Sequence, residues 1–229
     1  MKIGVFDSGK GGEFIAAGLR RLLPEHEYVV VNDREHVPYG SRSNEEVAAL
    51  TVAAIQPLLA ADCMVIVIAC NTATMAAMTT LRTAYPAIKF IGIEPMVKPA
   101  AALSRSGHIA VFATPLTLAS QRYRELVAQH ASNLLVDEPN TAGWAAAIEH
   151  DTLSEISFNE LREIIAGGCD VIVLACTHYL QLVSRIKETF PQVTILEPTE
   201  AIAQQITALA TPWVQAAAAQ PPASIDQYD

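Results

Sequence analysis

CMVIVIACNT, residues 63–72, recurs 106 positions later in the chain as CDVIVLACTH, residues 169–178. Both copies are short apolar runs that begin with a cysteine and reach a second cysteine, Cys70 or Cys176, which small polar residues follow. A repeat at a fixed offset is the signature of a duplicated structural unit. We therefore expect Cys70 and Cys176 to occupy equivalent places in two copies of one fold.

The same offset relates other parts of the chain. It places Ile3–Phe6 on Ile109–Phe112, two further apolar runs. The recurrence predicts a first half at residues 1–100 and a second half at residues 101–211, with the chain near the C-terminus returning to pack on the first half. Residues 212–229, rich in alanine and proline, are expected to form a short helix followed by disorder.

Each half alternates two kinds of pattern, which together predict the fold class. Short apolar runs without alternation predict strands that are covered on both faces. These runs are Ile3–Phe6, Tyr28–Val31, Met64–Ile68, Ile88–Ile93, Ile109–Phe112, Leu134–Val136, Val171–Leu174 and Val193–Leu196. The stretches with helical spacing are Gly12–Leu23, Asn44–Leu59 (capped by Ser43), Thr72–Ala84, Leu118–His130 and Ser157–Ala166. We expect an α/β protein with two similar doubly wound parallel sheets, related by a pseudo-twofold axis, and an active site in the cleft between them.

The composition excludes several classes of protein. Of the 229 residues, 51% are hydrophobic and 17% are charged, which favours a folded core over a disordered chain. A formal net charge of −9 lacks the basic footprint of a nucleic-acid binder or of a helix that lies on an anionic membrane. The most apolar run, Met64–Ala69, is too short to span a bilayer, and the early charges argue against a signal peptide. We expect a cytoplasmic protein whose four cysteines stay reduced.

The chemistry is expected where the strands end, because ligands of open parallel sheets bind beyond the carboxyl ends of the strands. Polar residues and glycines gather at these places, and amide groups of the following helices can receive an anion there. The segments concerned are Asp7–Gly12, Val37–Gly40, Cys70–Thr72, Thr114–Thr117 and Cys176–His178.

Two equivalent thiols that enter one cleft from opposite sides suit the inversion of a carbon centre. One thiolate removes a proton from one face of the carbon, and the other thiol delivers a proton to the opposite face. At pH 7 only about 3% of an ordinary thiol is ionised, so each cysteine needs a partner. Asp7 is the candidate beside Cys70, and His178 is the candidate beside Cys176.

Several residues have a plainer interpretation. Cys63 and Cys169 begin their strands and are expected in the core, and Asp7 alone could form a turn or cap a helix. Five further histidines show no ligand spacing and are expected at the surface: His26, His36, His108, His130 and His150.

Two other kinds of site fit the sequence less well. The loop Asp7–Gly12 lacks the spacing of a nucleotide-binding phosphate loop. A zinc site made by Cys70, Cys176 and His178 is conceivable, but no fourth ligand presents itself. We expect neither a metal nor a nucleotide.

Four motifs in order resemble the cofactor-independent amino-acid racemases of the aspartate/glutamate racemase superfamily, and among them the glutamate racemases. The motifs are Ile3–Gly9 (IGVFDSG), Val37–Gly40 (VPYG), Ala69–Thr74 (ACNTAT) and Ala175–Tyr179 (ACTHY). The resemblance runs from residue 3 to about residue 205. It implies an isomerase that works without pyridoxal phosphate or any other cofactor.

The resemblance also implies roles for individual residues. Cys70 and Cys176 would be the two bases, assisted by Asp7 and His178, and Glu149 aligns with a catalytic acid of the family. The residues expected to contact the substrate include two threonines, Thr114 and Thr117, from the turn after the fifth predicted strand. The full set is Asp7, Ser8, Pro38, Tyr39, Gly40, Asn71, Thr72, Thr114, Thr117, Thr177 and His178.

The chain matches or departs from the family at three further places. Asp33 matches another family acid. Lys10 stands where the family usually has a small apolar residue, and its charge could alter the mouth of the cleft. Residues 137–144 replace a stretch that contains cysteine and proline in the family, which leaves the choice of substrate open.

The predicted function is racemisation of an acidic amino acid, with conversion of L-glutamate to D-glutamate for peptidoglycan and cell-wall synthesis as the first expectation. Aspartate racemisation, or broad specificity for both amino acids, is the alternative. A protein of another class, which binds a dicarboxylate or a protein partner without turnover, is a third interpretation. The expected partner is a small amino acid, and the resemblance also implies a homodimer, because family members often pair.

Overall fold

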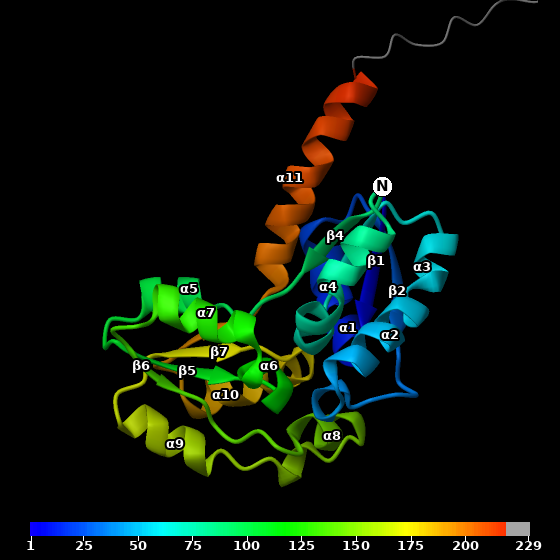
Figure 1. Cartoon of the computed structure of the whole chain (residues 1–229). Helices are drawn as coiled ribbons and strands as arrows, with labels where there is room; N and C mark the ends of the chain where they lie inside the picture. Colours follow the sequence, from blue (N-terminus) through cyan, green and yellow to red (C-terminus); the bar gives the residue numbers. More distant parts are fainter. Residues whose placement is uncertain (219–229) are drawn as a thin grey trace, which may run out of the picture.

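The computed structural model describes residues 1–218, and for residues 211–218 it describes the backbone alone (Figure 1). The strands form two four-stranded sheets in which every pairing is parallel. The first sheet has the order β2-β1-β3-β4 and the second has the order β6-β5-β7-β8. The strands are β1 (Lys2–Asp7), β2 (Glu27–Asn32), β3 (Val65–Ile68), β4 (Lys89–Gly92), β5 (His108–Phe112), β6 (Leu135–Asp137), β7 (Val171–Leu174) and β8 (Thr194–Leu196).

The two sheets share a register as well as a strand order. Ile3 of β1 pairs with Val65 of β3, and Ile109 of β5 pairs with Val171 of β7. The offset of 106 positions maps Ile3 to Ile109 and Val65 to Val171, so the two pairings are equivalent. The repeat found in the sequence is therefore a structural equivalence, and β3 and β7 lead into equivalent turns.

Helices cover both faces of each sheet, which explains why the strands are apolar without alternation. In the first half, α1 and α11 cover one face, and α2, α3 and α4 cover the other. In the second half, α5 and α7 cover one face, and α8, α9 and α10 cover the other. The helices are α1 (Gly11–Leu22), α2 (Asn44–Ala54), α3 (Gln56–Ala60), α4 (Asn71–Ala84), α5 (Val97–Leu103), α6 (Pro115–Ala119), α7 (Gln121–His130), α8 (Trp144–Glu149), α9 (Asn159–Ala166), α10 (Val183–Thr189) and α11 (Thr199–Ala218), with 3₁₀ turns η1 (Tyr39–Ser41), η2 (Leu153–Glu155) and η3 (Thr177–Leu182).

The last helix of each half crosses to the other half. Helix α5 follows β4 of the first sheet, but its Val97 and Ala100 belong to the core of the second half. Helix α11 follows β8 of the second sheet, and its Ile202 and Ile206 belong to the core of the first half. The C-terminal part of α11 projects away from both halves (Figure 1). The exchange ties the two halves together through two chain crossings.

Two of the expected helices are interrupted. The stretch at residues 44–59 forms two helices because Pro57, in the first turn of α3, has no N–H to continue the ladder of α2. The stretch expected at residues 118–130 begins earlier, as α6, and restarts after Ser120, whose hydroxyl caps α7 by accepting from the N–H of Tyr123 at 3.2 Å. Local hydrogen bonding thus overrides the helical spacing of the apolar residues.

Other expectations need correction or fall partly outside the described residues. His108, expected at the surface, is buried because it begins β5 and its Nε2 lies 2.6 Å from a carboxylate oxygen of Asp137. Helices α5, α8 and α10 were not expected, since seven residues or fewer show no clear periodicity. Residues 212–218 of the expected tail continue α11, and residues 219–229 lie outside the described residues. No helix at residues 1–218 is long and apolar enough to cross a membrane.

The cap of α2 provides a test of the fold. Ser43 accepts a hydrogen bond from the N–H of Glu46 at 3.2 Å, as its place before the helix predicts. Ser43→Ala removes that acceptor and should lower the free energy of unfolding by about 1 kcal/mol in urea denaturation. Ser43→Asp keeps an acceptor and should stay close to the wild type. An equal loss in both variants would contradict the assigned cap.

Candidate active site

Cys70 and Cys176 line one narrow cavity between the two halves, and each is about 7% exposed. The thiols reach it from equivalent turns, after β3 in the first half and after β7 in the second. The polar residues that line it are nearly as buried, with Ser8, Asn71 and Thr177 only 3–4% exposed. A molecule that contacts both sulfur atoms therefore lies in a site that protein encloses on most sides.

Most residues predicted to contact the substrate line this cavity. They are Ser8, Pro38, Tyr39, Gly40, Asn71, Thr72, Thr114, Thr177 and His178. Asp7 and Thr117 lie behind the lining and bond to members of it. Three apolar residues of the lining were not predicted: Val37, Ala145 and Ala175. Val37 and Ala175 adjoin motif residues, whereas Ala145 comes from α8, which is too short to give a periodic signal.

Cys70 is held at the start of α4 as its N-cap residue. Its Sγ accepts a hydrogen bond from the N–H of Ala73 at 3.4 Å, and the hydroxyl of Ser8 lies 3.3 Å away. Burial and the negative charge of Asp7 raise the pKa of the Cys70 thiol to about 12, and the two hydrogen bonds oppose this shift. The resting Cys70 is therefore a protonated thiol, with two donors in place to stabilise a thiolate.

Asp7 lies near Cys70, where the sequence predicts it, and its charge acts on that thiol. Its hydrogen bonds go elsewhere: its two carboxylate oxygens accept from the hydroxyl of Thr177 at 2.8 Å and from the N–H of Gly9 at 2.9 Å. Its influence on Cys70 is therefore through its charge. Burial raises the pKa of Asp7, although the charge of His178 opposes the shift. Asp7 thus connects the end of β1 with the turn that carries the second cysteine.

Cys176, His178 and Glu149 form a chain of proton-carrying groups. The Sγ of Cys176 lies 3.7 Å from Nδ1 of His178, and Nε2 of the same ring lies 2.6 Å from Oε1 of Glu149. Burial disfavours the imidazolium, but the contacts with Cys176 and Glu149 outweigh it and raise the pKa of His178 to about 11. The pKa of Glu149 is lowered, because bonds from His178 and from the N–H of Lys10 outweigh the effect of burial. An ion pair therefore stands behind the second thiol.

Aromatic packing positions the helix that carries Glu149. Trp144 begins α8, and its ring stacks on Phe112 with the centroids 5.6 Å apart and meets Tyr179 edge-on at 5.6 Å. Such ring pairs add to the free energy of burial. The same short helix presents Ala145 to the cavity and Glu149 to the histidine. Trp144 thus fixes one wall of the site.

A glycine is required where the first half meets this ion pair. A Cβ atom at Gly9 would lie 2.2 Å from Oε1 of Glu149 and 2.5 Å from Nε2 of His178. No side chain fits at such distances. The glycine of the IGVFDSG motif therefore permits the close approach of the two halves.

Hydroxyl groups from both halves meet across the cleft. The Oγ1 atom of Thr72, on α4, lies 3.0 Å from that of Thr114 and 3.4 Å from that of Thr117. Asn71 is buried, and its Oδ1 has no hydrogen-bond partner, so it is free to accept from an N–H donor. The described lining includes no lysine or arginine. A carboxylate in the cavity would be met by hydroxyls, by amide groups at the start of α4 and by His178.

Asp33 contributes from outside the cavity. The hydroxyl of Tyr39 donates to Oδ2 of Asp33 at 2.6 Å, and Nδ1 of His36 lies 2.8 Å from Oδ1. Burial, and then the contact with Asp33, raise the pKa of Tyr39. Asp33 therefore holds a neutral Tyr39 in the wall. Among residues 1–218, no group of three or more His, Cys, Asp or Glu side chains is arranged to hold a metal ion.

Comparison with known proteins gives one consistent result. The family model for Asp/Glu/hydantoin racemases matches residues 13–206. The chain is 38% identical to a glutamate racemase of Ectopseudomonas mendocina over 90% of this chain and 81% of that protein. It is 39% identical to a glutamate racemase of Roseiflexus sp., over 89% of this chain and 77% of that protein.

Solved structures resemble the fold closely. A glutamate racemase from Escherichia coli, in complex with L-glutamate and the activator UDP-MurNAc-ala, has a TM-score of 0.82 and 27% identity over 92% of this chain and 82% of that one. A glutamate racemase isoform from Bacillus anthracis has a TM-score of 0.77 and 30% identity, with the same coverage of 92% and 82%.

The His178–Glu149 pair makes a prediction about protonation. In Glu149→Gln the ring loses its anionic partner, so the pKa of His178 should fall from about 11. Nitrogen NMR of the ring between about pH 6 and pH 9 should show a doubly protonated imidazole in the wild type and a titrating one in the variant. Glu155→Gln removes an exposed carboxylate from the same segment and serves as the matched control.

The same pair makes stability depend on pH in a defined direction. Because the folded pKa of His178 lies above its ordinary value of 6.5, its stabilising effect is complete below about pH 6.5 and is lost as the pH rises towards about 11. The difference in unfolding free energy between the wild type and Glu149→Gln should therefore shrink over that range. A constant difference would contradict the ion pair.

Proposed function

The chain belongs to the Asp/Glu/hydantoin racemase family, and on this basis we propose that it interconverts L- and D-glutamate with Cys70 and Cys176 as the two bases. The observation that carries the proposal is that cysteines at equivalent strand ends of a duplicated fold line one cavity from two sides. A pair of acid/base groups on opposite faces is what inversion of a carbon centre requires.

In each direction one sulfur begins as a thiolate and the other as a thiol. The thiolate removes the α-hydrogen as a proton from one face of the amino acid, and the thiol returns a proton to the opposite face. Cys70 is a resting thiol that Ser8 and Ala73 can stabilise when it ionises. His178 lies within reach of the Cys176 sulfur to exchange a proton with it. Atoms and charges balance, because one proton leaves and one is delivered.

The developing negative charge needs fixed donors, since an α-hydrogen beside a carboxylate is very weakly acidic. Hydroxyls of Ser8, Thr72 and Thr177 and the amide groups at the start of α4 face the cavity. Donors that are already aimed at the reacting carboxylate lower the barrier without reorganisation. The free Oδ1 of Asn71 suits the substrate's ammonium group.

The proposal extends to the role of the product. D-glutamate is a component of peptidoglycan, so the reaction would supply cell-wall synthesis. All four cysteines are free, which suits a reducing compartment such as the cytoplasm. A homodimer remains a prediction from the family resemblance, and size-exclusion chromatography with light scattering would measure it.

The two cysteines provide the direct test. Exchange of the α-hydrogen of glutamate with solvent deuterium, followed by NMR, should slow by about 10²- to 10⁴-fold in Cys70→Ala and in Cys176→Ala, since each variant loses one acid/base group. Cys63→Ala and Cys169→Ala change buried cysteines outside the cavity and serve as controls. Racemisation by Cys70→Ala at the wild-type rate would refute the proposal. Thermal stabilisation by glutamate without any exchange would point to a binding protein instead.

The choice of substrate is a separate prediction. Incubation with L-glutamate and with L-aspartate, followed by chiral chromatography, should yield D-glutamate much faster than D-aspartate, because the relatives at 38–39% identity are glutamate racemases. A faster yield of D-aspartate would assign the chain to aspartate racemisation. Equal rates would indicate broad specificity for both acids.

A further inference from the structure

Lys10 connects the two halves at the edge of the cleft by two separate contacts. Its backbone N–H donates to Oε1 of Glu149 at 2.6 Å, and its ammonium group lies 2.9 Å from Oδ2 of Asp151. Lys10 stands just before α1 in the first half, and both acceptors belong to the turn that ends α8 in the second half. One residue therefore holds two points of the segment that supplies the carboxylate partner of His178.

The carboxylate of Asp151 is presented by a tight turn at the end of α8. Its φ of 59° lies in the left-handed region, which aspartate adopts more readily than most residues. Backbone bonds from the N–H of Asp151 to the carbonyl of Ile148 at 3.3 Å, and from the N–H of Thr152 to that of Ala147 at 2.8 Å, close the turn.

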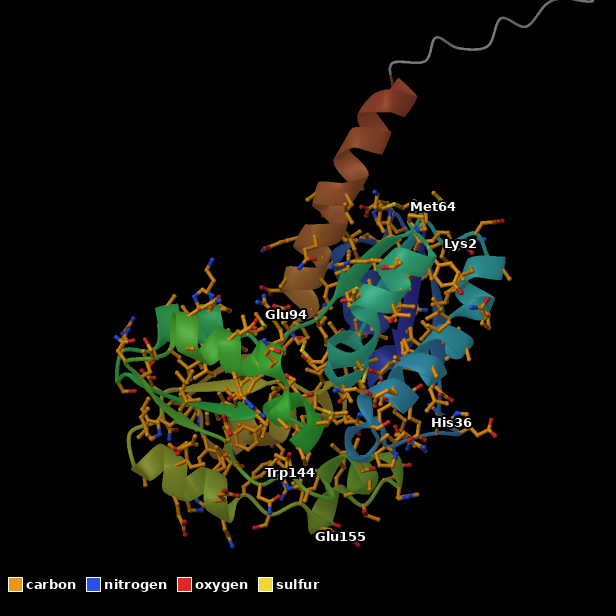
Figure 2. All side chains as sticks on the ribbon, in the orientation of Figure 1. Lys2, His36, Met64, Glu94, Trp144 and Glu155 are labelled. Atoms are coloured by element: carbon orange, nitrogen blue, oxygen red, sulfur yellow. The ribbon has the colours of Figure 1, made fainter. Side chains whose placement is uncertain are left out.

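Two ion pairs join the first half to the second within residues 1–218. Arg122 on α7 pairs with Glu94, which lies where the chain passes between the halves (Figure 2). Lys10 pairs with Asp151, which follows α8 on the opposite face of the second sheet. Separation of the halves at the Glu94 side is limited by the chain itself, whereas at α8 only non-covalent contacts resist it. The Lys10–Asp151 pair is the charged contact at that side.

We propose that Lys10 is a positioning residue that clamps the cleft shut and sets the carboxylate of Glu149 against His178 when the halves close. The two thiols and the polar side chains beside them are at most 7% exposed, so an amino acid enters by opening the cleft, which breaks the bond from the Lys10 N–H to Glu149. The ammonium–Asp151 pair then favours re-closure. The clamp acts on the closing of the cleft, whichever acidic amino acid the site accepts.

The test measures cleft opening through the two thiols, without substrate. Both thiols are about 7% exposed in the closed protein, so their alkylation by iodoacetamide, followed by peptide mass spectrometry, reports how readily the cleft opens. Lys10→Met removes the charge and keeps the backbone N–H. Both thiols should then react about two- to fivefold faster and by the same factor, which is the range expected for an ion pair with one exposed partner. Raising NaCl from about 0.05 M to about 0.5 M should speed the wild type towards the variant and leave the variant nearly unchanged.

Three further variants complete the test. Asp151→Asn removes the partner charge, and asparagine tolerates the left-handed conformation, so this variant should match Lys10→Met. The double variant should open no further than either single one, since all three lack the same pair. Lys89→Met removes an exposed lysine from β4 and should react as the wild type does.

Four results would overturn the clamp. Three of them concern the cavity thiols: unchanged alkylation in Lys10→Met, a change confined to one of the two thiols, and additive effects of the two single variants. Cys63 and Cys169, which are 0% and 3% exposed, report unfolding of the two cores. Equal acceleration at all four cysteines would mean that Lys10 stabilises the whole fold, which also excludes the clamp. Because no amino acid is added, these outcomes are independent of the racemisation assay.

Discussion

The pairing of β1 with β3, repeated as the pairing of β5 with β7, is the constraint on which the site depends. In both sheets the parallel register brings the third strand to the same level beside the first, so the cysteines that follow emerge at equivalent places. A shift of one residue in either pairing would turn the strand's side chains to the other face. Helices bury both faces of these four central strands, so a shifted register would place each side chain in packing shaped for another.

The two halves share a backbone, but the environments of their thiols differ. Cys70 has a helix N–H and a hydroxyl as its donors and the negative charge of Asp7 nearby. Cys176 has an imidazole that is paired with a carboxylate. Geometry is therefore nearly symmetric while electrostatics is not. A racemase must work in both directions, and the asymmetry gives each thiol its own means of gaining or losing a proton.

The site is completed by contacts between the halves. Thr177 of the second half donates to Asp7 of the first, Lys10 of the first half donates to Glu149 of the second, and Thr72 meets Thr114 across the cleft. Each contact breaks if the halves separate. Closure thus brings the polar groups of the two halves into one buried site. Burial strengthens the electrostatic interactions inside.

The sequence by itself determined the apolar runs that form the strands, the offset of 106 residues that relates the halves, the two cavity cysteines and most polar residues of the lining. These follow from short-range patterns, since a buried strand and the turn after it are written in consecutive residues. The tertiary structure alone decided that Asp7 bonds to Thr177 and that Lys10 reaches Glu149 and Asp151, pairs 139 to 170 positions apart. It also decided that Ala145 enters the wall, because α8 is placed by the packing of Trp144. No local pattern encodes such pairs, because they exist only where two separately folded surfaces meet.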